Sequence, residues 1–100
     1  MGPIRVLFHR LAARELRCAR NWYRERSVEA ADRFSVAVDQ AVSQIIARGD
    51  ALPPVNKDYR YIRVNRFPYV LIFQTDGGGV VKVVAVAHTS RRPGYWRRRK

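Results

Sequence analysis

The sequence has a single cysteine and no long apolar run, and each of these shortages excludes a class of protein. Cys18 cannot form an internal disulfide, so the fold does not depend on an oxidising compartment. No segment approaches the roughly 18 consecutive apolar residues of a membrane-spanning helix, and the first residues carry no cleavage pattern of a secretory signal. We therefore expect a cytoplasmic protein without a membrane partner.

Acidic residues are also scarce, and this leaves a large positive charge. The chain has 20 lysines and arginines against 8 aspartates and glutamates, a net charge of +12. Residues 1–50 hold nine basic and six acidic side chains (net +3), whereas residues 51–100 hold eleven and two (net +9). Such a potential favours polyanions or acidic proteins as partners, and it places the anion-binding function in the second half.

The length of 100 residues and the apolar content of 47% predict one domain over residues 1–100, with a basic C-terminal tail at 91–100. Residues 4–8 predict a strand, and residues 11–26, with neither proline nor glycine, predict an amphipathic helix. Ser27 is the expected N-cap of a second helix that Gly49 ends. Three strands are predicted at residues 59–66, 70–73 and 80–88, and a hairpin turn joins the last two.

The predicted fold class is α+β, with an N-terminal strand and an antiparallel helical hairpin packed on one face of a mostly antiparallel four-stranded sheet. In the last strand, alternation puts Val81, Val83, Ala85 and Ala87 on a wholly apolar side, which we assign to the helices. His88 then falls on the opposite, partly open face. Five arginines are expected to converge beside it: Arg60, Arg63, Arg66, Arg91 and Arg92.

This order of elements and several motifs resemble the RelE/ParE superfamily, the toxins of type II toxin-antitoxin systems. The motifs cover nearly the whole chain: LAARELRCARNWY, AADRFSVAVDQAVSQI, YRYIRVNRFPYVLIF and VVAVAHTSRRPGYW. The RFPY segment and the closing H-x-x-R-R-P-x-Y-W are the most specific parts. The resemblance implies a growth-inhibiting toxin that a cognate acidic, partly disordered antitoxin holds inactive.

The resemblance leaves the target open, because function depends on the site and not on the fold. ParE-like members inhibit DNA gyrase, whereas RelE-like members cleave messenger RNA on the ribosome without a metal. The His-x-x-Arg ending and the missing lysine cluster in the central strands favour the gyrase poison. The terminal aromatic residues and the density of arginines keep the ribonuclease as an alternative, and a non-toxic basic RNA-binding domain is a third.

Under the ribonuclease alternative, His88 is the acid or base, Arg91 stabilises the phosphate charge, and Tyr95 is an acid or a stacking partner. A structural alternative is that His88 only closes the strand by hydrogen bonding to a nearby loop. The remaining residues predicted to bind anions or RNA are Arg60, Arg63, Arg66, Arg92, Arg97 and Arg98.

Aromatic residues outside the core pattern are candidates for partner binding, and these are Trp22, Tyr61 and Trp96. We expect Trp96 to dock back onto the sheet or the helices as a lid, since a tryptophan so close to a core strand has apolar surface to bury. His9 is expected to begin the first helix. No cluster of residues resembles a metal site, and no cofactor is predicted.

Overall fold

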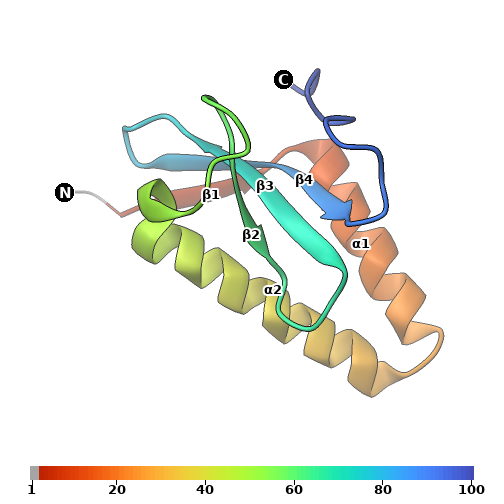
Figure 1. Ribbon diagram of the computed structural model, residues 1–100. Helices are drawn as coiled ribbons and strands as arrows, with labels where there is room; N and C mark the ends of the chain where they lie inside the picture. The colour runs from red at the N-terminus through yellow and green to blue at the C-terminus, as the bar shows by residue number, and fades with distance from the viewer. Residues whose placement is uncertain (1–2) are drawn as a thin grey trace.

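The computed structural model describes residues 3–100 and has its elements in the predicted order (Figure 1). Strand β1 (Arg5–Phe8) leads into helices α1 (Arg10–Arg24) and α2 (Val28–Arg48) and a short 3₁₀ helix, η1 (Gly49–Ala51). Three strands follow: β2 (Arg60–Arg63), β3 (Tyr69–Thr75) and β4 (Val80–His88). Neither helix of this described part is both long enough and apolar enough to cross a membrane.

Both helices begin at side chains that cap them. The Nδ1 atom of His9 accepts a hydrogen bond from the backbone N–H of Leu11 at 3.1 Å. Ser27 Oγ accepts one from the N–H of Ala30 at 3.2 Å, as the sequence predicts for the start of α2. These bonds satisfy N–H groups that have no partner inside the first turn of a helix.

The sheet has four strands in the order β1-β4-β3-β2. β1 runs parallel to β4, and the other neighbours are antiparallel. The turn between β3 and β4 is organised by Asp76, whose Oδ1 accepts hydrogen bonds from Gly78 N at 2.7 Å and Val80 N at 3.1 Å. Gly77 and Gly79 supply the positive φ angles, +74° and +95°, that this tight hairpin needs.

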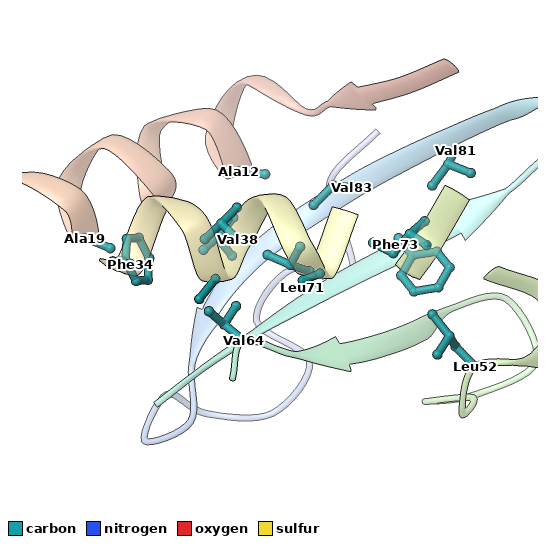
Figure 2. Close-up of a cluster of buried hydrophobic side chains, with 14 residues drawn as sticks. Ala12, Ala19, Phe34, Val38, Leu52, Val64, Leu71, Phe73, Val81 and Val83 are labelled. Carbon is teal, nitrogen blue, oxygen red and sulfur yellow. The ribbon is translucent and has the colours of Figure 1, made fainter. Parts of the chain in front are cut away.

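The main core lies between the two helices and one face of the sheet. Phe34 and Val38 of α2 and Leu71 and Phe73 of β3 belong to this core cluster, and Ala12 brings α1 close to the same layer (Figure 2). These five side chains are almost fully buried. The fold class is therefore as the sequence indicates.

β4 contains a bulge that the sequence does not reveal. Ile72 of β3 pairs with Ala85, and the next residue of β3, Phe73, pairs with Val83. Val84 is thus an extra residue on β4 with no partner opposite it. One extra residue shifts the two-residue alternation of a strand, so the side chains beyond it change faces.

The bulge makes half of the predicted face assignment wrong. Val81 and Val83 precede it and pack in the helix-side core, as expected. Beyond it, Val86 packs on the helix side, while Ala85 and Ala87 join a second cluster on the other face. The apolar side of β4 is therefore divided between both faces of the sheet.

The C-terminal segment, residues 89–100 (blue in Figure 1), packs over part of the face of the sheet away from the helices, which the sequence predicts to be partly open. Trp96 is only 3% exposed and packs with Ile72 and Val84 in the second cluster. Its ring lies edge-on to Tyr59 with the centroids 4.7 Å apart. Trp96 therefore forms the lid that its apolar surface predicts, and Tyr61 packs against the same cluster.

Candidate functional site

Glu15 is the centre of a polar cluster that joins α1, β4 and the C-terminal segment. Its carboxylate accepts hydrogen bonds from Val86 N at 3.0 Å, from the Tyr95 hydroxyl at 2.7 Å and from Arg99 at 2.7 and 2.9 Å. Arg99 also donates to the backbone oxygen of Val84 at 3.0 Å. The side chains of Glu15 and Arg99 are 16% and 12% exposed, so the pair is shielded from water.

The cluster forms beside the part of β4 that β1 does not pair with. The pairing of β1 with β4 ends at Phe8 opposite Val83, so the following residues of β4 have a free edge on that side. Unpaired backbone groups at a sheet edge need partners when they are covered. Glu15 accepts the Val86 N–H and Arg99 donates to the Val84 oxygen, which closes this edge with side chains in place of a strand.

The surroundings of Glu15 favour its charged form. Burial alone would raise the pKa of Glu15, but the hydrogen bonds from Arg99, Tyr95 and Val86 outweigh burial and hold the pKa below its ordinary value of 4.5. Burial, followed by the hydrogen bond to the Glu15 carboxylate, raises the pKa of Tyr95 well above its usual range. Tyr95 therefore remains a hydrogen-bond donor at neutral pH.

A cleft of about 430 Å³ lies beside this cluster, between α1 and the end of β4. Trp22 stands at its rim with half of its surface exposed (50%), and the Arg26 guanidinium lies 3.4 Å from the centre of its ring. The walls are mostly apolar or aromatic, and they are formed by Cys18, Ala19, Trp22, Tyr23, Pro68, Tyr69 and Val86, with Glu15, His88 and Arg91 as the polar members.

His88 lines this cleft on the helix side, so its predicted position on the open face is wrong. The bulge is the physical reason, because His88 shares its face with Val86 beyond the extra residue. Its ring is edge-on to Tyr69 with the centroids 5.1 Å apart. Its Nδ1 lies 3.0 Å from Ser90 N and 2.7 Å from Ser90 Oγ, the loop contact that the structural alternative describes.

Arg91 is the one predicted arginine that the structure places beside His88, since both line the cleft. Its guanidinium lies 3.7 Å from the ring centre of Tyr95, and its Nη1 is 3.5 Å from Glu15 Oε2. The three residues of the ribonuclease alternative, His88, Arg91 and Tyr95, are therefore neighbours. Arg91 and Tyr95 share a carboxylate partner, Glu15, that the sequence-based prediction did not include.

The predicted convergence of the other arginines is wrong. Arg60 is half-buried and donates to the backbone oxygen of Leu52 at 2.6 Å. Arg63 is exposed at the end of β2, and Arg66 lies in the following turn beside α2. The others, Arg92, Arg97 and Arg98, are exposed along the C-terminal segment. These side chains are distributed around the molecule, and their role in binding anions stays a prediction.

Glu15 and Arg99 are the residues that the sequence-based prediction missed. They are 84 positions apart, so no local pattern connects them. One signal was present, since Glu15 is the only acidic residue among the five arginines of α1. Within residues 3–100, no group of three or more histidine, cysteine, aspartate or glutamate side chains is placed to hold a metal ion.

The architecture defines the class of the protein: a small basic α+β domain in which a helical hairpin packs on a four-stranded sheet, as in the toxins of the RelE/ParE superfamily. The model of the ParE toxin family, described as the ParE toxin of the type II toxin-antitoxin system parDE, matches residues 6–93. The chain belongs to this family. The resemblance seen in the sequence is thereby confirmed.

A solved structure described as the chromosomal ParDE TA system from P. aeruginosa is similar to this chain. The TM-score is 0.65 with 15% sequence identity, and the match covers 85% of this chain and 95% of the other. At this identity the likeness supports the shared fold and no detail of the site. No match was found among curated protein sequences.

Proposed function

We propose that this chain is the toxin of a type II toxin-antitoxin pair, that it inhibits growth by poisoning DNA gyrase, and that a cognate acidic antitoxin neutralises it. Membership of the ParE family supports gyrase over the ribosome as the target. The observation that carries this choice is the Glu15 carboxylate, which engages the groups that a ribonuclease would need for its substrate.

A metal-independent ribonuclease needs free cations to stabilise the phosphorane and an acid and a base that can move protons. Arg91 is already beside the Glu15 carboxylate, and Tyr95 donates its hydroxyl to the same group. His88 has its Nδ1 occupied by Ser90. A phosphate that entered here would meet the negative charge of Glu15, so the arrangement supports a toxin that acts by binding a protein.

The cleft between α1 and β4 is the surface that we assign to the antitoxin. Its apolar walls and the half-exposed Trp22 offer an anchor site for an apolar side chain of the partner. An acidic segment that orders on binding fits such a surface because the net charge of the chain is +12.

Trp22→Ala is therefore expected to weaken antitoxin binding by about 30-fold, or roughly 2 kcal/mol, because a half-exposed tryptophan that a partner covers is a typical hot spot. Isothermal titration calorimetry with the antitoxin encoded beside this chain measures the effect. The matched control is Val36→Ala, an equally exposed apolar residue on α2 away from the cleft (54% exposed). Equal affinities of the two variants would contradict the assignment.

The proposed function is tested by expressing the chain from an inducible promoter in bacteria. We expect growth arrest with a DNA-damage response and gyrase-dependent double-strand breaks, while messenger RNA stays intact. His88→Gln is expected to keep this toxicity, because the Nδ1 atom of His88 is engaged by Ser90 of its own loop and its ring packs on Tyr69. Messenger RNA cleaved between codon positions, with toxicity lost in His88→Gln, would favour the ribonuclease. Normal growth would favour the non-toxic RNA-binding domain.

A further inference from the structure

The outer surface of α1 carries a continuous line of arginines. Arg10, Arg14, Arg17 and Arg24 follow one another at spacings of four, three and seven residues. At about 100° per residue, these positions fall within an arc of about 80° on one side of the helix. All four side chains are exposed, and we call them the α1 arginine stripe.

The stripe faces away from the rest of the molecule. Ala12 and Ala19 are the buried residues of α1 and mark its inner side. Glu15, the only acidic residue of the helix, is turned toward β4 and the C-terminal segment. In the described chain, residues 3–100, the ion pairs are those of Glu15 with Arg91 and Arg99, so no carboxylate neutralises the stripe.

The stripe opposes the stability of its own helix. Arg10 stands in the first turn, which has no acidic residue, although the helix dipole favours anions there. Like charges three or four residues apart on a helix, as in Arg10 with Arg14 and Arg14 with Arg17, repel one another and destabilise the helix. α2 has a different balance of charge: it holds two arginines and three acidic residues, whereas α1 holds five arginines and one acidic residue. Because these positive charges destabilise their own helix, we infer that they are there to bind an anionic ligand.

We propose that the α1 arginine stripe binds the sugar-phosphate backbone of a nucleic acid. At 1.5 Å per residue the stripe is about 21 Å long, a length that faces about six phosphates of one strand of a duplex. The planar guanidinium group binds phosphate oxygens in pairs, and every cation of the stripe is an arginine. Asn21 lies on the same line and is exposed, so its amide can donate to a further phosphate.

This inference is independent of the gyrase proposal, because its test needs only the purified chain and labelled nucleic acid. Fluorescence anisotropy would measure binding to a 20-base-pair DNA duplex, an RNA duplex of the same sequence and the single-stranded RNA, between about 50 and 200 mM KCl. Four phosphate contacts predict a slope of log K against log salt of about −3.6 for duplex DNA. The relative affinities of the three probes identify the natural source of the backbone.

The test variant carries Gln at Arg10, Arg14, Arg17 and Arg24. We expect at least a tenfold loss of affinity near 100 mM salt and a slope smaller in magnitude by about 3.6, since each of the four arginines removed ends the release of about 0.9 counterion. The control variant carries Gln at four exposed cations on other elements, Arg5, Arg33, Arg48 and Lys57, and loses the same charge. It is expected to bind within about threefold of the wild type, because these cations lie outside the proposed contact.

Equal losses in the two variants would overturn the proposal, because binding would then follow net charge alone. It would also be overturned if the stripe variant bound nucleic acid like the wild type, or if it lost only the affinity for the acidic antitoxin. Arg17→Gln alone is expected to reduce the slope by about one, and circular dichroism reports whether each variant keeps its helices. If the fourfold variant does not fold, the Arg17→Gln variant still tests the proposal, because an unchanged slope in that variant would contradict it.

Discussion

At the scale of the single residue, Glu15 connects three parts of the chain that are far apart in sequence. Its carboxylate takes the place of a strand at the free edge of β4 and binds both Tyr95 and Arg99 of the C-terminal segment. Removing one partner of a shielded, hydrogen-bonded ion pair leaves the other charge without compensation. Glu15 therefore holds the last ten residues in place together with the buried Trp96.

Glu15→Gln is expected to lower the free energy of unfolding by about 3 kcal/mol, since Arg99 loses its anion in a shielded position. Urea unfolding followed by circular dichroism measures the change. Glu25→Gln, an exposed glutamate just after α1, is the matched control and is expected to change stability by less than about 0.5 kcal/mol. A similar loss in both variants would show that the Glu15 cluster contributes nothing specific.

The stability difference between the wild type and the Glu15→Gln variant is also expected to depend on pH. The pKa of Glu15 is lower in the folded state than its ordinary 4.5, so its contribution to stability is complete above that pH and is lost as the pH falls through the folded value. The stability difference between wild type and Glu15→Gln should thus be constant from pH 7 to about pH 5.5 and shrink toward pH 3. Glu29 and Asp76, whose pKa values are also lowered, cancel in this difference.

At the scale of the element, the C-terminal segment packs on the sheet as a structural layer. Trp96→Ala is expected to destabilise the fold by about 3 kcal/mol, because it removes a buried ring and leaves a cavity over Ile72 and Val84. Trp22→Ala serves as the control, since half of that ring is exposed and its loss should cost less than about 1 kcal/mol. Chemical denaturation of both variants measures the two losses in free energy of unfolding. Equal losses would contradict the role of Trp96 as a buried lid.

The regular elements follow from sequence periodicity, but the faces of β4 do not. Ser27 and the apolar spacing define α2 locally, and the helix begins where they indicate. The run VVKVVAVAH is apolar at seven of nine positions, so no polar residue marks where alternation shifts. The bulge at Val84 is fixed by the pairing with β3 and by the second cluster, which are long-range contacts. The predicted environment of His88 was wrong for this reason.

At the scale of the whole molecule, the distribution of charge is more informative than its total. Counted by halves, most of the positive charge lies in residues 51–100 (net +9, against +3 for residues 1–50). The structure shows that α1 alone holds five arginines and one glutamate, an excess masked in that count by the acidic residues of α2. Averaging over a segment of sequence cannot reveal a stripe, because only the helix brings residues three and four apart onto one surface.

The most direct test of the proposed function is a supercoiling and DNA-cleavage assay with purified gyrase and the purified chain. We predict that the chain inhibits supercoiling and causes cleaved DNA to accumulate, and that the cognate antitoxin restores activity. His88→Gln should inhibit equally well, because the proposed action does not use its imidazole. Full gyrase activity in an excess of the folded chain, with messenger RNA cut on programmed ribosomes by the same preparation, would contradict the proposal.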